Sequence, residues 1–114
     1  MFAVDAREKR LVSNEAMFRE VNERIEEIAV LHGQPQDEHV YEFLCECSNV
    51  DCTLRVQLTV GAYEQVRQDS TQFLVAGGHE LPEIEDVVFR CPEYQIVRKR
   101  GEAAALAEAE DPRD

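Results

Sequence analysis

Residues 43–52 of this chain read Phe-Leu-Cys-Glu-Cys-Ser-Asn-Val-Asp-Cys and contain three of its four cysteines. Cys45, Cys47 and Cys52 form a C-x-C-x4-C pattern, and His79 follows two glycines further along the chain. Three thiolates and one imidazole are a ligand set that closed, tetrahedral zinc sites use. Glycines before His79 let the backbone approach the cysteines closely. We therefore predict that Cys45, Cys47, Cys52 and His79 bind zinc in a structural site.

The residues around the cysteines alternate between apolar and polar, as β-strands do. Residues 39–46 and residues 54–58 each place apolar side chains at every second position. Between them, residues 48–51 read Ser-Asn-Val-Asp, which is typical of a turn. The pattern predicts an antiparallel hairpin whose tip carries the three cysteines as a zinc knuckle.

The following residues predict one short helix and further antiparallel strands. Thr59 is a suitable N-cap for a helix from Val60 to about Gln68. Residues 72–76 are expected to form a third strand, and residues 87–98 a second hairpin. We therefore expect an α+β fold, in which a long N-terminal helix precedes a small antiparallel sheet with a zinc-knuckle hairpin and one short helix.

Residues 5–32 predict one long helix, with Asp5 as its N-cap and Gly33 followed by Pro35 as its stop. Its apolar positions recur every three or four residues, as in a coiled-coil seam with one polar member; the positions are Leu11, Asn14, Phe18, Val21, Ile25, Ile28 and His32. Two interpretations are open. The stripe packs against the protein's own sheet, or it forms a homodimer seam or partner groove in which Asn14 fixes the register.

These elements divide the chain into three parts. Residues 1–33 form the N-terminal helix with its coiled-coil-like seam, residues 34–100 a small zinc-stabilised α+β domain, and residues 101–114 an acidic, Ala-rich tail. The tail favours a helix that has little to bury, and its end from Asp111 is expected to fray. A core of fewer than about 70–80 residues rarely supplies more than about 3–5 kcal/mol, so a bound metal would add stability that the small domain needs.

The composition narrows the range of partners. The chain of 114 residues has a net charge of −12 and no basic segment, which disfavours nucleic acids and anionic membranes as partners. It contains no apolar run long enough to span a membrane and no signal-peptide pattern at its start, so we expect a cytoplasmic protein. Thiols stay reduced in that compartment, which favours metal binding over disulfides.

Other interpretations of the cysteines remain open. Cys47 and Cys52 could form a redox pair, and zinc release on their oxidation would make the protein a thiol-based redox sensor. Cys91, on an apolar strand face, is expected in the core or, alternatively, as the fourth ligand in place of His79. A metal-dependent enzyme would keep an open position on the zinc and use a nearby acid such as Glu46 or Glu80. A full set of three cysteines and a histidine favours a closed site, so the sequence assigns no catalytic residue.

The middle of the chain resembles a family of short uncharacterised actinobacterial proteins. The resemblance spans roughly residues 15–105 and rests on residues 20–26, 46–52, 63–67, 73–75 with 78–80, and 101–104. It implies that the three clustered cysteines and His79 belong to the family's recurring pattern, and that a polar residue is usual where this chain has Cys91. It implies no particular activity.

The expected function is that of a small zinc-binding protein that serves as a protein-interaction or regulatory module. Its contact with a protein partner, or with a second copy in a homodimer, would be the N-terminal helix. The acidic surface is the alternative contact and would suit a basic protein. No residue in the sequence identifies that partner.

Overall fold

The computed structural model describes residues 6–32 and 39–111, and for His32 the backbone alone. It confirms the predicted α+β fold, with a long N-terminal helix, small antiparallel sheets and two shorter helices. The elements are α1 (Ala6–His32), β1 (Val40–Leu44), β2 (Arg55–Thr59), α2 (Val60–Arg67), β3 (Gln72–Val75), β4 (Glu85–Arg90), β5 (Gln95–Lys99) and α3 (Gly101–Ala109). The predicted N-cap Asp5 and the predicted helix stop at Gly33 and Pro35 lie outside the described residues.

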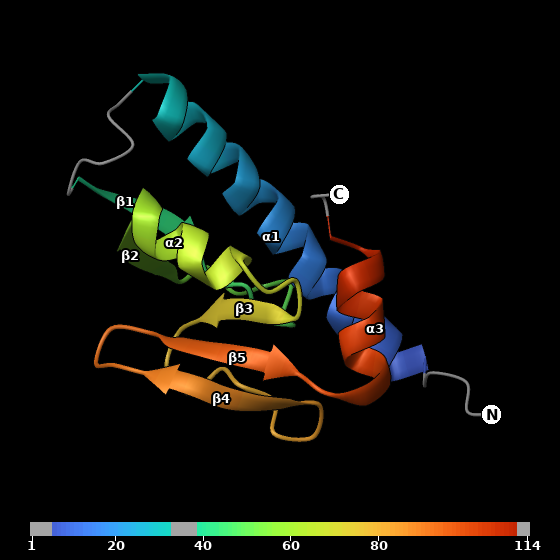
Figure 1. The fold of residues 1–114 in the computed structure, drawn as a ribbon. Helices are drawn as coiled ribbons and strands as arrows, with labels where there is room; N and C mark the ends of the chain where they lie inside the picture. Colours follow the sequence, from blue (N-terminus) through green and yellow to red (C-terminus); the bar gives the residue numbers. More distant parts are fainter. Residues whose placement is uncertain (1–5, 33–38, 112–114) are drawn as a thin grey trace.

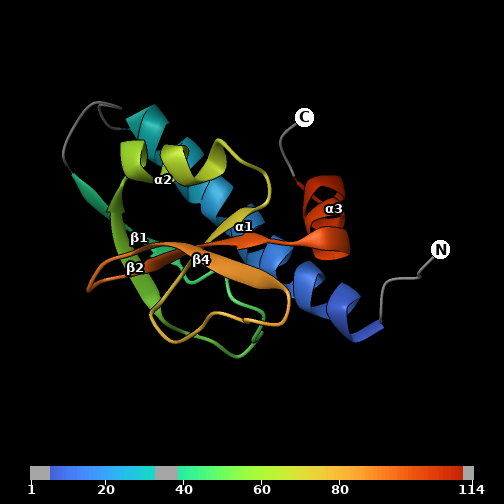
Figure 2. The same ribbon diagram turned by 60° about the horizontal axis from the view of Figure 1, so that its bottom comes forward.

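The strands form two antiparallel sheets. β1 pairs with β2, and Phe43 lies opposite Val56 in that hairpin. The second sheet has the order β3-β5-β4, with an irregularity between Val87 and Phe89. α1 runs along one side of the molecule and packs directly on β1, with α3 beside its N-terminal half and α2 near its C-terminal half (Figure 1; Figure 2). Thr59 caps α2 as predicted, because its hydroxyl accepts the Ala62 N–H at 3.1 Å.

Glu46, the residue between the first two cysteines, joins the two sheets. Its N–H donates to the Leu74 carbonyl at 2.6 Å, and its carboxylate accepts the Leu74 N–H at 2.9 Å. The same carboxylate accepts the Tyr63 hydroxyl of α2 at 2.5 Å and the Asn22 amide of α1 at 2.8 Å. The segment after β1 therefore covers the outer edge of β3 and is attached to both helices.

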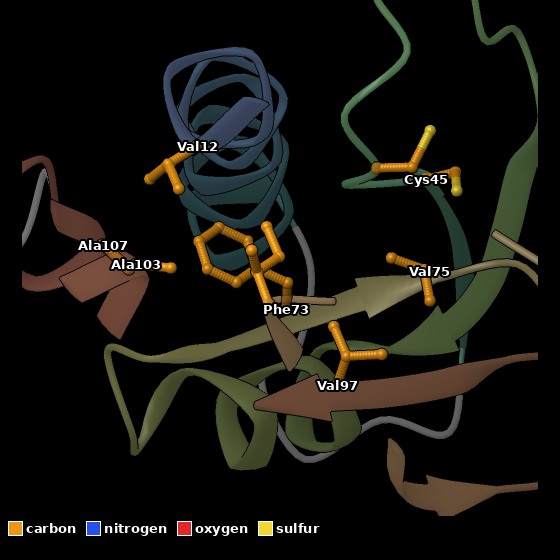
Figure 3. Close-up of a cluster of buried hydrophobic side chains, with 9 residues drawn as sticks. Val12, Cys45, Phe73, Val75, Val97, Ala103 and Ala107 are labelled. Carbon is orange, nitrogen blue, oxygen red and sulfur yellow. The ribbon is translucent and has the colours of Figure 1, made fainter. Parts of the chain in front are cut away.

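Two clusters of apolar side chains form the core. One lies under α2 and consists of Phe43, Val56, Leu58, Tyr63, Val66 and Leu74. The other lies between α1, α3 and the three-stranded sheet, and it contains Val12, Cys45, Cys47, Phe73, Val75, Ile84, Val97, Ala103 and Ala107 (Figure 3). Two of the predicted zinc ligands are thus part of the second cluster.

The C-terminal residues differ from the expectation that they have little to bury. α3 is helical as predicted, but Ala103 and Ala107 are both fully buried in the cluster that also holds Val12 of α1. Asp111, which was expected to fray, forms an ion pair with the buried Arg67 of α2. The alanines are small enough to let α3 approach α1 closely, and this explains how a weakly apolar helix becomes part of the core.

α1 buries a polar face. Glu15, Arg19 and Asn22 are fully buried in it. Lys99 of β5 donates to the Glu15 carboxylate at 2.5 Å, and the Arg19 guanidinium lies 3.6 Å from the centre of the Phe73 ring. These contacts satisfy the two buried groups only in part, because one Glu15 oxygen and two Arg19 nitrogens have no hydrogen-bond partner among the described residues.

The residues of the predicted seam on α1 are partly packed against the core and partly exposed. Leu11 and Ile25 pack at the edges of the core clusters, whereas Val21 and Ile28 are exposed, Ile28 by 59% of its surface. The interpretation that the whole stripe packs against the protein's own sheet is wrong for Val21 and Ile28. Their side of α1 also exposes Met17 and Leu31, so it presents an apolar surface to solvent.

Candidate metal centre

The four predicted ligand residues come from two connections that face each other. Cys45 directly follows β1, and Cys47 and Cys52 lie in the connection from β1 to β2. His79 lies in the connection from β3 to β4, where its N–H donates to the Ala76 carbonyl at 3.1 Å in a turn. Gly78 has a φ of +85°, a backbone conformation that a residue with a side chain rarely adopts. The glycine therefore makes the tight turn that brings His79 to the cysteines.

The ligand atoms of Cys45, Cys47, Cys52 and His79 all lie within 4.8 Å of one another. Nδ1 of His79 is 3.5 Å from Sγ of Cys45 and 3.7 Å from Sγ of Cys52. Zinc bonds of about 2.3 Å to sulfur and about 2.0–2.1 Å to nitrogen place these atoms about 3.6 Å apart in a regular tetrahedron. The two distances from His79 are therefore close to those of a tetrahedral metal site, and His79 would bind a metal through Nδ1.

The turn that returns Cys52 to the other cysteines depends on Asn49. Its side-chain oxygen accepts the Asp51 N–H at 2.9 Å, and its carbonyl accepts the Cys52 N–H at 3.0 Å. Asn14 of α1 donates to the Ser48 carbonyl at 2.9 Å and ties the same turn to the helix. Asn14, which the heptad pattern suggested as a register-fixing residue of a dimer, is thus bound within its own chain. A polar residue in an apolar stripe is a signal that such a partner exists, but it does not reveal which one.

Backbone and thiol hydrogen bonds support the sulfur atoms. The Ala76 N–H donates to Sγ of Cys45 at 3.1 Å. The hydrogen bond with Cys45 is the main cause that lowers the pKa of the Cys47 thiol to about 4, and His79 lowers it further, while burial opposes the change. The same interaction with Cys47, together with burial, raises the pKa of Cys45. The metal-free cluster therefore already favours one thiolate, and a zinc ion would stabilise the deprotonated form of all three.

The cluster is buried on one side and open on the other. Cys45 and Cys47 are almost fully buried, whereas Cys52 and His79 are partly exposed. A polar hollow of about 250 Å³ adjoins the cluster, and it is lined by Cys47, Ser48, Asn49, Gly78, His79, Glu80 and Leu81. A metal ion, a chelator or a small oxidant could reach the ligands from this side.

Of the remaining candidate residues, Cys91 and Glu46 have other contacts, whereas Glu80 lies beside the cluster. Cys91 is partly buried in the β4–β5 turn, where its N–H donates to the Tyr94 carbonyl at 3.0 Å, and it is not part of the ligand group. The Glu46 carboxylate binds Tyr63, Asn22 and Leu74, as described above. Glu80 lines the hollow. The arrangement therefore offers four protein ligands and places Glu46 in a structural network.

Comparisons of the sequence and the structure with protein-family models, with curated proteins and with solved structures give no match. The resemblance to short actinobacterial proteins therefore stays a prediction. Within residues 6–32 and 39–111, no helix combines the length and the apolar character needed to cross a membrane.

Proposed function

We propose that this protein is a small zinc-binding module for protein interaction or regulation, in which one zinc ion on Cys45, Cys47, Cys52 and His79 has a structural role. The observation that carries the proposal is the grouping of these four ligand atoms within 4.8 Å of one another. These atoms come from two loops, the β1–β2 connection of one sheet and the β3–β4 connection of the other. An ion held there would fix the β1–β2 hairpin to the three-stranded sheet.

A structural role is supported by the number of ligands that the chain supplies. Four protein ligands fill a tetrahedral zinc site and leave no position for water or substrate. Zinc binding contributes on the order of 10 kcal/mol to the folding of small modules. The metal-bound state would also position α1, because Asn14 ties the cysteine turn to that helix.

The proposed contact with a protein partner, or with a second copy, is the exposed apolar side of α1. Met17, Val21, Ile28 and Leu31 are exposed there, at intervals of three, four or seven residues. An apolar surface on a helix is costly in water and is typical of an interaction site. Nucleic acids are disfavoured because the chain has a net charge of −12.

A redox sensor is the second candidate, favoured by the partial exposure of Cys52 and by the hollow beside Cys47. In this reaction a peroxide takes two electrons from the Cys47 and Cys52 thiolates. The O–O bond of hydrogen peroxide breaks, and its two oxygens take up two protons from solvent and leave as two water molecules. An S–S bond forms between the two cysteines, and Zn²⁺ is released. Zinc release by hydrogen peroxide that a dithiol and added zinc reverse would support this function. Retention of zinc under millimolar peroxide would exclude it.

Native mass spectrometry and thermal unfolding test the structural zinc. The wild-type protein and Cys91→Ser should each carry one zinc ion and lose thermal stability in a chelator. Cys52→Ser and His79→Ala should lose the ion and melt at a lower temperature even without chelator. The proposal would be refuted by a wild-type protein that carries no metal, takes up none when zinc is added, and melts unchanged in the chelator.

A further inference from the structure

A groove far from the cysteine cluster lies between the C-terminal part of α1 and the start of α2. Its volume is about 610 Å³, and among the described residues it is lined by Glu26, Glu27, Val30, Leu31, Val60, Gly61 and Glu64. Val30 and Leu31 are largely exposed, Leu31 by 78% of its surface. The groove is within the usual size range of ligand and peptide sites and continues the exposed apolar side of α1 through Leu31.

Gly61 keeps the floor of this groove open. Gly61 is the second residue of α2, and glycine favours a helix less than alanine does. Nothing in the described chain requires this glycine, since its φ is not positive and a Cβ built on it would meet no atom within 4 Å. Among the described residues, the missing side chain therefore makes no contact that a Cβ would prevent. It leaves the backbone of α2 accessible to a group that enters from outside.

The charges around the groove indicate which group fits. Three of its lining side chains are carboxylates, and no described lining residue is basic. A second copy of this chain would bring another net charge of −12 to the same place, and an anionic membrane would be repelled as well. A segment that combines basic and apolar side chains would complement the negative charge beside the groove, at Glu27, and the apolar floor.

We propose that this groove binds a basic, amphipathic helix of a partner protein. The apolar side chains of that helix would pack on Val30 and Val60 over Gly61, and its lysines or arginines would face the exposed Glu27. Such helix-in-groove binding uses apolar anchors three or four residues apart. The inference rests on the proposed function as an interaction module and adds the location of the contact and the chemistry of the partner.

A synthetic peptide tests the inference on the full-length, zinc-loaded protein. The probe is a fluorescein-labelled helix of leucine and lysine in amphipathic order, and a peptide with glutamate in place of lysine is its control. Fluorescence anisotropy at about 0.15 M salt should show binding of the lysine peptide alone. Gly61→Phe should fill the groove and weaken binding at least about tenfold, which corresponds to about 1.4 kcal/mol. Gly61→Ala should preserve binding and raise the melting temperature.

Two matched charge reversals distinguish binding at the groove from general electrostatic attraction between the lysine peptide and the acidic protein. Glu27→Lys should weaken binding about tenfold, whereas Glu93→Lys, at an exposed position in the β4–β5 turn, should leave it nearly unchanged. The inference is overturned if the lysine peptide does not bind, if both reversals weaken binding equally, or if Gly61→Phe binds as well as the wild type. Self-association that Gly61→Phe abolishes would also overturn it, by assigning the groove to a second copy.

Zinc content and circular dichroism are measured on the same samples. Normal zinc content and helicity without peptide binding would refute the groove alone. Absence of zinc from the wild-type protein would refute the proposed metal centre, whether or not the peptide binds.

Discussion

Replacing Glu46 with alanine should destabilise the protein more than any other single change at a carboxylate on the β1 hairpin. The Glu46 side chain is fully buried and accepts hydrogen bonds from Tyr63, Leu74 and Asn22, at 2.5, 2.9 and 2.8 Å. Alanine would leave the Tyr63 hydroxyl and the Leu74 N–H without their partner. The Asn22 amide would keep its second acceptor, the Leu44 carbonyl at 2.9 Å.

The magnitude follows from these donors. Each buried donor that loses its partner raises the free energy of the folded state by about 1–3 kcal/mol. Two orphaned donors and one weakened donor therefore predict a loss of about 3–5 kcal/mol. Tyr63→Phe removes one donor together with its hydrogen bond and should cost only about 1–2 kcal/mol.

Urea unfolding at saturating zinc, followed by circular dichroism, measures both losses. Glu42→Ala is the matched control, because Glu42 lies exposed on the neighbouring strand β1, and it should change the free energy of unfolding by less than about 0.5 kcal/mol. In the Glu46→Ala background, Tyr63→Phe should barely change the free energy of unfolding, because the hydrogen bond between the two residues is already lost. A cost below about 1 kcal/mol for Glu46→Ala, or equal costs for Glu46→Ala and Glu42→Ala, would refute the reasoning.

Three further predictions follow from other sites. Cys91→Ser should leave the number of zinc ions per chain unchanged by native mass spectrometry, because Cys91 lies outside the ligand group; loss of zinc would contradict this. Thr59→Ala should lower the free energy of unfolding by about 1 kcal/mol in a urea titration, since the Thr59 hydroxyl caps α2; an unchanged midpoint would show that the cap contributes nothing. Burial raises the pKa of Glu15 from 4.5 to about 8, so the folded state binds a proton that the unfolded chain has already released in this range. The stability that this proton provides is lost as pH rises from about 4.5 to about 8, by up to about 1.4 kcal/mol per pH unit. Relative to the wild type, Glu15→Gln should therefore become progressively more stable between pH 5 and pH 8 in zinc-saturated urea titrations; parallel pH profiles would be inconsistent with the raised pKa.

The α+β class and the grouping of Cys45, Cys47, Cys52 and His79 could both be anticipated from the sequence. The three cysteines are close in the chain, and thiolates are typical ligands of structural metal sites. The fourth follows two glycines, whose freedom of rotation signals a tight turn. Local spacing and residue type were sufficient here because the site is built from two turns.

The orientation of α1 could not be predicted in the same way. Periodicity of apolar residues pointed to a stripe that includes Val21 and Ile28, but the buried face carries Glu15, Arg19 and Asn22. The groups that satisfy these three side chains belong to strands and loops far along the chain, such as Lys99, which is 84 residues from Glu15. No local sequence pattern reveals contacts between residues so far apart in the chain. From periodicity alone, the apolar stripe of such a helix is therefore taken for its buried face.

The packing of α3 was missed for a different reason. Ala103 and Ala107 have little apolar surface, so their burial predicts only a small gain in stability. Their value lies in the close approach that they allow between α3 and α1, which depends on the shape of the opposing helix. The pattern of the tail alone therefore indicated a helix and did not indicate its place in the core.

X-ray absorption spectroscopy, combined with elemental analysis of protein purified without added metal, tests the central claim most directly. We expect one zinc ion per chain, coordinated by three sulfur atoms at about 2.3 Å and one nitrogen atom at about 2.0–2.1 Å. The nitrogen shell should disappear in His79→Ala, and it should remain in Cys91→Ser. Protein without zinc, or zinc bound mainly by oxygen ligands, would contradict the assignment of Cys45, Cys47, Cys52 and His79 as a structural zinc site.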